Sequence, residues 1–166
     1  MSTIYLPYTH DCFVCGASNQ YGLQLRFRAE NGEILADFHP KPHHAGYKGI
    51  VHGGIIASAL DETMFWATAF AKKQFHLSVE LSVCYQKKVA AAQSYLLIAR
   101  LTRERKKLCF TAGELRDAAG QVCATATGKY FPMRGEAVPL CMEDFHADPK
   151  TLSPMEFFPN RVKMYS

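Results

Sequence analysis

The sequence predicts an α+β fold in which a curved antiparallel sheet wraps around one long apolar helix. Three observations predict it: an Ala-rich apolar stretch, alternating apolar and polar residues before and after that stretch, and a length of 166 residues that suits one domain. Apolar residues make up 48% of the chain and charged residues 20%, which excludes a disordered chain, because such chains carry more charge and fewer apolar residues.

The segment before the apolar stretch predicts an irregular leader followed by a β-hairpin. Residues 1–22 contain several chain breakers, so we expect no regular structure there. Residues 23–28 alternate between apolar and polar, Asn31-Gly32 is a strong hairpin turn, and residues 34–38 return as the second strand. A loop rich in Pro, His and Gly follows over residues 40–49.

The apolar stretch over residues 53–71 predicts the helix. It contains no proline, consists mostly of good helix formers, and is followed by Lys72 and Lys73, whose charges favour a helix C-terminus. Apolar side chains occur nearly all round it, so we expect burial on most sides. It does not predict a membrane span, because Asp61 and Glu62 interrupt it and a span needs about 18–20 unbroken apolar residues.

Four strands are predicted after the helix. Residues 77–85 alternate with a clean period of two, and three further candidates cover residues 94–103, 107–116 and 121–131. Charged or Asp-Ala-Ala-Gly turns separate these candidates. After Pro132 the chain becomes irregular again, and we interpret the remainder as a loop-rich or short-helical extension over the domain.

We therefore divide the chain into an irregular leader (1–22), one domain (23–131) and a C-terminal extension (132–166). One sheet cannot bury both sides of so apolar a helix. Pairing two copies through the sheet edge would cover an unprotected strand and enlarge the core. We accordingly expect a homodimer, or a dimer of dimers.

Charge and the N-terminus exclude several partners. The net charge is +4, and the basic run that includes Arg103, Arg105 and Lys106 has no aromatic ladder for stacking bases, so we expect no nucleic-acid partner. The first residues have neither a basic start nor an apolar core, which predicts no signal peptide and a cytoplasmic protein with no membrane partner. The six cysteines are then expected to be reduced thiols.

The segment that carries chemistry begins at His52-Gly53-Gly54. These residues open the helix, where unpaired N–H groups and the helix dipole favour negative charge, as an oxyanion site requires. Asp61 lies farther along the same helix, and a carboxylate there is costly to bury unless it acts as a general base or a nucleophile. Gly53 and Asp61 are about 12 Å apart along a helix, so joint action on one substrate requires two subunits.

This pattern resembles the signature of hotdog-fold acyl-CoA thioesterases, particularly the phenylacetate-pathway type and the 4-hydroxybenzoyl-CoA thioesterase-like domains. The resemblance covers roughly residues 12–131, including the opening Cys12-Phe-Val-Cys-Gly-Ala-Ser-Asn-Gln-Tyr-Gly-Leu and the strand Ser78-Val-Glu-Leu-Ser-Val-Cys-Tyr. It implies the hotdog fold and hydrolysis of an acyl-CoA to a carboxylic acid and free CoA, and we expect no cofactor.

The resemblance also implies roles for individual residues. Asp61 matches the catalytic carboxylate, Gly53 the glycine whose N–H polarises the thioester carbonyl, and His52 the neighbouring histidine. Ser78 occupies the position of a hydroxyl that holds the attacking water. A structural histidine explains His52 about as well, and an ordinary outward-facing strand residue explains Ser78 nearly as well. For Asp61, the alternative of a polar residue at a dimer seam is less favoured.

Further residues are assigned to substrate binding. We expect Gly54 beside the thioester, and Met64 and Phe65 along an acyl tunnel. Arg103 and Arg105 are candidates for contacts with the CoA phosphates. Relatives often carry Asn or Gln six or seven residues before the His, where this chain has Ala45-Gly46, so either His44 replaces that contact or the contact is missing.

Two motifs receive no catalytic role at this point. Cys12-x-x-Cys15 is half of a zinc site, but no second cysteine pair follows and no βαβ pattern surrounds it, so we expect neither a metal nor a thioredoxin-like role. Glu62 is turned about 100° from Asp61 around the helix, so we expect that the two cannot face one site. The alternative functions are a non-catalytic acyl-CoA-binding hotdog protein and, less favoured, a hotdog hydratase or dehydratase.

Overall fold

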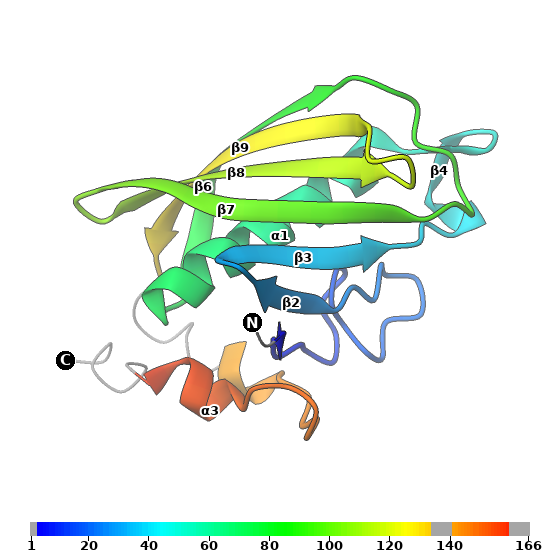
Figure 1. Cartoon of the computed structure of the whole chain (residues 1–166). Coiled ribbons are helices and arrows are strands. Elements are labelled where there is room, and N and C mark those ends of the chain that lie inside the picture. The colour runs from blue at the N-terminus through cyan, green and yellow to red at the C-terminus, as the bar shows by residue number, and fades with distance from the viewer. Residues whose placement is uncertain (1–2, 134–140, 160–166) are drawn as a thin grey trace.

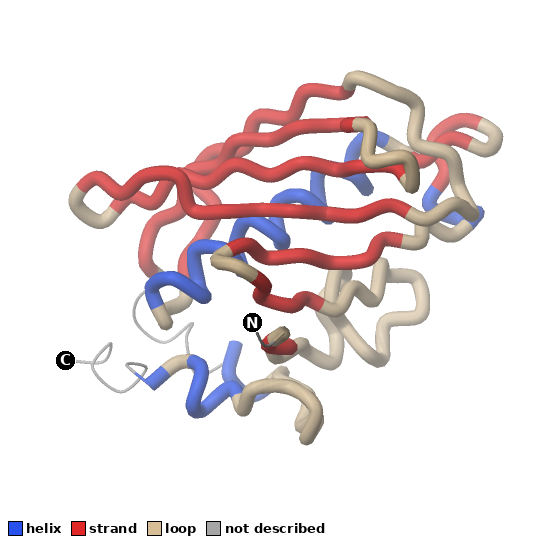
Figure 2. The backbone as a smooth tube through the Cα atoms, viewed as in Figure 1, coloured by secondary structure: helices blue, strands red, loops and turns tan. Residues whose placement is uncertain are grey.

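The computed structural model describes residues 3–133 and 141–159. A seven-stranded antiparallel sheet curves over helix α1 (Gly53–Lys72), as Figures 1 and 2 show. The strand order is β1-β2-β3-β7-β8-β9-β6. The strands are β1 (Ile4–Tyr5), β2 (Phe27–Glu30), β3 (Glu33–Phe38), β6 (His76–Tyr85), β7 (Tyr95–Arg105), β8 (Leu108–Asp117) and β9 (Val122–Pro132); the short pair β4 (Ala45–Tyr47) and β5 (Ile50–Val51) and a 3-10 turn (Pro42–His44) precede the helix. The predicted α+β hotdog fold is confirmed.

The first strand of the hairpin before the helix begins later in the chain than predicted. Strand β2 begins at Phe27, and the expected start at residue 23 is wrong. Gln24 has a positive φ of 52°, which interrupts an extended chain. The N–H groups of Leu23 and Leu25 instead donate to carbonyls of the leader. The Asn31-Gly32 turn is present as expected, with both residues at positive φ.

Helix α1 begins and ends at recognisable caps. The His52 side chain caps the N-terminus, and Lys73, in the left-handed conformation, caps the C-terminus. Leu60 and Met64 are fully buried under the sheet, and Trp66 is 1% exposed. Phe65 and Phe70 are only partly buried. Within the described residues, no helix is both long enough and apolar enough to cross a membrane.

The leader contributes β1 to the sheet, so the expectation of no regular structure in it is wrong. The rest of the leader and the C-terminal extension form a layer on the side of α1 away from the sheet (Figure 1). Thr9 pairs with Phe145 in an isolated β-bridge, and the His146 N–H donates to the Tyr8 carbonyl. Three phenylalanines of the extension contact Trp66 on α1: Phe145, Phe157 and Phe158. The short helix α3 (Pro154–Phe157) carries one of them. Contacts therefore cross both expected domain boundaries, and the division at residues 22 and 131 stays a prediction; residues 134–140 and 160–166 of the extension lie outside the described part.

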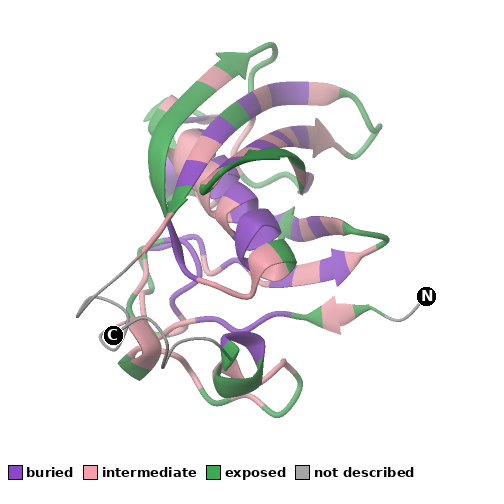
Figure 3. Cartoon of the chain, turned by 90° about the vertical axis from the view of Figure 1, so that its left-hand side faces the viewer, coloured by how far each residue is buried: buried purple, intermediate pink, exposed green. Residues whose placement is uncertain are grey.

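Strand β6 is the outermost strand of the sheet on its far side from β1. Eight of its ten residues are exposed, which Figure 3 shows as a green outer strand. Among them are Leu77 and Val79, 54% and 58% exposed. An unpaired strand edge with exposed apolar side chains is a surface that natural proteins normally cover.

Candidate active site

The first turn of α1 leaves one backbone donor free. The Gly54 N–H donates to His52 Nδ1 at 2.9 Å, so the side chain at the N-cap already satisfies it. Gly53 is the first helical residue and has no acceptor one turn back. Within the described chain, we find no acceptor for the Gly53 N–H. The Tyr85 hydroxyl donates to the Gly53 carbonyl at 2.8 Å and holds this end of the helix against β6.

A cavity of about 280 Å³ surrounds this helix start. Its walls include the His52-Gly53 pair, the loop at Gly46, and two basic residues that the sequence analysis did not single out, Lys87 and Lys88. A Cβ on Gly46 would lie 3.0 Å from the His52 ring, so the loop closely approaches this side chain. A free N–H with nearby lysines makes this end of α1 favourable for negative charge.

Asp61 lies near the middle of α1 and is held by Tyr130 of β9. The Tyr130 hydroxyl lies 2.7 Å from Oδ1 of Asp61 and 2.9 Å from its carbonyl oxygen. Burial, followed by the nearby Asp61 charge, raises the pKa of Tyr130, so this phenol remains a hydrogen-bond donor. Ser78 of β6 is paired directly with Tyr130 in the sheet, which brings its hydroxyl to the same place.

Tyr130 was not identified from the sequence. It is 0% exposed, and its alternation within strand β9 predicts an inward side chain. A buried tyrosine needs a partner for its hydroxyl, but the sequence does not say that the partner is Asp61, 69 residues earlier.

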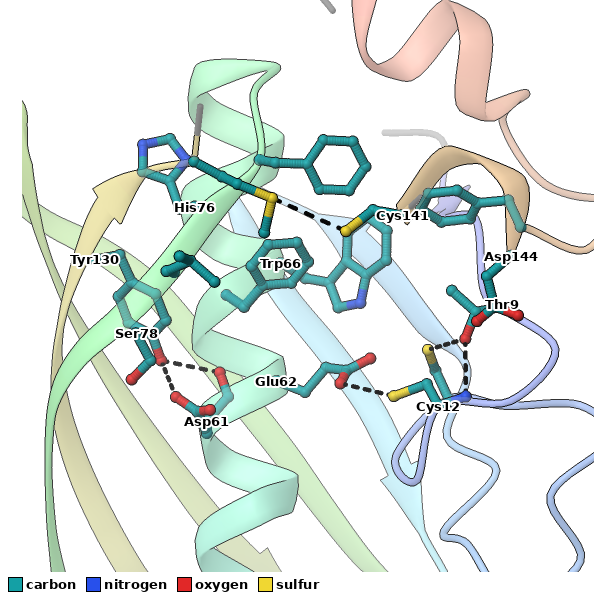
Figure 4. A pocket seen from close by; sticks show the side chains of 16 residues that line it. Thr9, Cys12, Asp61, Glu62, Trp66, His76, Ser78, Tyr130, Cys141 and Asp144 are labelled. Carbon is teal, nitrogen blue, oxygen red and sulfur yellow. Dashed lines mark hydrogen bonds between the residues drawn. The ribbon is translucent and has the colours of Figure 1, made fainter. Parts of the chain in front are cut away.

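Asp61 lines the larger of the cavities at α1, with a volume of about 440 Å³ (Figure 4). Glu62 lines the same cavity, so the expectation that the two carboxylates cannot face one site is wrong. The cavity extends around the helix, and the rotation between neighbouring residues sends Asp61 toward β6 and β9 and Glu62 toward the leader (Figure 4). The complete lining is Thr9, Cys12, Cys15, Asp61, Glu62, Phe65, Trp66, Phe75, His76, Leu77, Ser78, Tyr130, Met133, Cys141, Asp144 and Phe145.

The surroundings of Glu62 differ from those of Asp61. Sγ of Cys12 lies 3.3 Å from Oε2 of Glu62, within hydrogen-bond distance. Burial, followed by the charge of Cys12, raises the pKa of Glu62 to about 8. The indole of Trp66, one helical turn later, opposes this shift through its N–H, which favours the charged carboxylate. This side of the cavity therefore holds thiols, a carboxyl group and an indole N–H in close proximity.

The structure distributes the other candidate residues over three places. Phe65 lines the larger cavity, whereas Met64 is buried in the core with its side chain against Gly113. His44 is also buried, with backbone groups of Lys41 and Tyr21 at its two ring nitrogens. Met64 and His44 line neither cavity.

The two arginines lie far from the helix start. Arg103 and Arg105 are exposed on β7 and flank Glu104, which pairs with Lys72 at 2.8 Å. Lys72 ends α1, so this position is at the opposite end of the helix from Gly53. Arg103 is stacked over the Phe110 ring instead of lining a cavity at α1. Contacts from these arginines to phosphates stay a prediction.

Asp61 and Gly53 belong to different cavities of one chain. The two cavities have no lining residue in common. Eight residues of helix separate the two positions, which corresponds to about 12 Å. One substrate carbon within reach of both groups therefore requires a second subunit.

Comparisons with known proteins agree with this architecture. Residues 48–124 match the sequence model of the Thioesterase superfamily. The uncharacterized protein C26H8.11c of Schizosaccharomyces pombe is 32% identical over 96 residues, which cover 55% of each chain. The match thus spans about half the length of this curated relative.

Solved structures share the fold. Protein RHA08564, described as a thioesterase superfamily protein, is 26% identical with a TM-score of 0.69, and the match covers 74% of this chain and 60% of that protein. Escherichia coli PaaI, from the phenylacetic acid degradation operon, is 15% identical with a TM-score of 0.62 (68% and 82% covered). Protein smu.793 of Streptococcus mutans, solved with acetyl CoA bound, is 17% identical with a TM-score of 0.60 (66% and 88% covered). Residues 48–124 of this chain are thus similar to the Thioesterase superfamily, and the chain shares the hotdog fold of these solved structures.

Proposed function

We propose that this protein is an acyl-CoA thioesterase that hydrolyses a thioester to a carboxylic acid and free CoA. The observation that carries the proposal is Asp61, a carboxylate that accepts a hydrogen bond from Tyr130 at the wall of a largely apolar cavity. The match of residues 48–124 to the Thioesterase superfamily model supports the reaction class. The acetyl CoA bound to the Streptococcus mutans protein supports a CoA ester as the substrate class.

The chemical step follows from the positions of the two groups. Asp61 accepts a proton from a water molecule, and the water oxygen attacks the thioester carbon. The carbonyl electron pair moves to oxygen, and the Gly53 N–H of the partner subunit donates to this oxyanion. When the carbonyl re-forms, the C–S bond breaks, and the leaving CoA thiolate takes the proton that Asp61 held. Ser78, paired with Tyr130, orients the attacking water.

The second subunit is part of this proposal. The exposed edge of β6 supports a homodimer in which two sheets join. Ser78 and Tyr85 both belong to β6, so this edge connects the Asp61 cavity with the helix start. A partner chain along β6 would thus lie beside both halves of the site.

The experiment that tests the activity is a thiol-release assay with short, medium, long and aromatic acyl-CoA esters. We expect the wild-type protein to release CoA from at least one class, and Asp61→Ala to abolish release while the oligomer remains intact by size-exclusion chromatography. Unchanged turnover in Asp61→Ala would overturn the mechanism. CoA-ester binding without thiol release by the wild type would identify a non-catalytic binding protein instead.

A second experiment tests whether the site spans two subunits. Gly53→Pro removes the N–H at the first helical position, where proline is tolerated, and Gly53→Ala is the matched control that keeps it. Gly53→Pro and Asp61→Asn are each expected to be inactive. Co-expressed and purified together, they should regain about a quarter of wild-type activity, because half of the dimers are mixed and each mixed dimer has one intact site. A mixture that stays inactive would place both groups within one chain.

A further inference from the structure

A cluster of two cysteines and a glutamate lies outside the catalytic chemistry described above. Sγ of Cys12, Sγ of Cys15 and a carboxylate oxygen of Glu62 all lie within 4.8 Å of one another. The cysteines come from the leader and Glu62 from the middle of α1, 50 residues after Cys12. The fold has therefore brought together three groups that all bind metals, in the larger cavity beside Asp61 (Figure 4).

The turn that holds the cysteines is shaped to direct both thiols to one place. The Gly16 N–H donates to the Cys12 carbonyl at 2.9 Å, and the Val14 N–H donates to Cys12 Sγ at 3.3 Å. A Cβ at Gly16 would lie 2.3 Å from the Cys12 carbonyl oxygen, so only glycine fits at the end of this turn. An N–H that donates to sulfur favours the thiolate, which is the form that binds metal.

Charge supports a cation at the same place. Two thiolates and a carboxylate repel one another when they ionise together in a buried site. A divalent cation removes this repulsion because it neutralises all three.

We propose that Cys12, Cys15 and Glu62 bind one divalent metal ion of the zinc class. Thiolates with one carboxylate select a borderline-soft ion such as Zn²⁺ over Mg²⁺ or Ca²⁺, which prefer oxygen ligands alone. All three residues line the cavity, so a fourth coordination position is open to water or a small ligand.

The metal would join the leader to α1 next to the catalytic carboxylate. Zinc with three protein ligands and one exchangeable position is the arrangement of catalytic sites, whereas structural sites have four protein ligands. The inference does not rest on the thioesterase proposal, because it concerns metal binding and its test does not read turnover.

The test uses the full-length protein, reduced and stripped of metal with a chelator. Titration with Co²⁺ should give a thiolate-to-cobalt charge-transfer band and the visible bands of a tetrahedral site, at one equivalent per chain. Competition with a chromophoric chelator then gives the zinc affinity.

Cys12→Ser and Cys15→Ser should lose the charge-transfer intensity. Glu62→Gln should weaken zinc binding by at least roughly tenfold, since even changes to residues that only hydrogen-bond a metal ligand have effects of this size. Cys141→Ser, which also lines the cavity but lies outside the cluster, is the matched control and should bind as the wild type does.

Three results would overturn the proposal. The first is a cobalt spectrum in Cys12→Ser that equals the wild-type spectrum. The second is an unchanged zinc affinity in Glu62→Gln, a variant that keeps both thiols and decides the matter if a cysteine variant does not fold. The third is a Cys12–Cys15 disulfide in the purified protein together with no zinc binding after reduction, which would indicate a redox pair. A zinc-dependent rise in the melting temperature of the wild type and of Cys141→Ser, absent from Cys12→Ser, would support the site independently.

Discussion

The two sides of the larger cavity differ in a way that helix α1 alone does not explain. On the side of the sheet, Asp61 meets a tyrosine hydroxyl from β9 and the neighbouring Ser78. On the side of the leader, Glu62 meets two thiols. The two carboxyl groups are consecutive in sequence, yet about 100° of helical rotation places them in different surroundings.

The chemical role of each carboxyl group on the helix therefore depends on the segment that packs beside it. A buried phenol is a neutral donor, so it orients the Asp61 carboxylate and leaves its second oxygen for a water molecule. Two thiols lie within 4.8 Å of the Glu62 carboxylate, and these three groups can share one cation. The sheet side is suited to proton transfer, and the leader side to metal binding.

The largest expected effect concerns Asp61. Asp61→Asn keeps the size of the side chain but removes the proton acceptor, so kcat/KM should fall by about 10²–10⁴-fold. The measurement is CoA release from the best substrate of the acyl-CoA panel. Asp144→Asn, a change of the same kind at another residue lining the cavity, is the control and should retain wild-type activity. Equal losses in the two variants would mean that Asp61 has no special role.

The second prediction compares how much the packing on each side of α1 contributes to the free energy of unfolding. Phe158 is 1% exposed and stacks on Phe75 with ring centroids 3.9 Å apart. Phe158→Ala should lower the free energy of unfolding by about 3–5 kcal/mol. Leu97→Ala, in the sheet, should cost about 2–5 kcal/mol. Urea unfolding measures both, and Tyr21→Ala, 71% exposed, should stay within about 0.5 kcal/mol of the wild type. A negligible cost at Phe158 would show that the extension is not part of the cooperative core.

The third prediction concerns Tyr130, a positioning residue. Tyr130→Phe removes the donor to Asp61, and the loss of a hydrogen bond to a charged group should lower kcat by roughly tenfold to a hundredfold with little change in KM. Tyr95→Phe is the matched control, because it removes another half-buried hydroxyl contact, to the Ala90 N–H, away from the cavity. The control should lose stability and keep its kcat. A Tyr130→Phe variant that loses stability but keeps its kcat would contradict the role of Tyr130 as a positioning residue.

The smallest effect is a pH dependence that originates at His76, on the sheet side. Burial lowers the pKa of His76, so the unfolded chain binds its proton at a higher pH than the folded chain. The neutral imidazole therefore contributes fully to the free energy of unfolding above about pH 6.5. This contribution is lost as the pH falls below that value. Urea unfolding at several pH values should show this decline, and His76→Asn should reduce it. His39→Asn, at an exposed histidine, should leave the decline unchanged.

Much of the fold was predictable because it depends on local periodicity. The alternation over residues 77–85 predicted β6, which covers His76–Tyr85, and the proline-free apolar stretch predicted α1 to within one residue. The start of β2 was missed, because a positive φ at Gln24 depends on contacts between the leader and the hairpin. For the site, the sequence identified Asp61 and the helix start as the candidates for chemistry. It missed Tyr130 and the shared cavity of Glu62, since both depend on segments that are distant along the chain.

The sequence by itself determined one long apolar helix, the strands around it, and a carboxylate inside that helix, since residue spacing encodes these features directly. Only the tertiary structure decided which groups meet the two carboxyl groups. Tyr130 follows Asp61 by 69 residues, and Cys12 precedes Glu62 by 50. Hydrogen bonds and metal sites require distances of a few ångströms between such segments, and no periodicity along the chain specifies those distances.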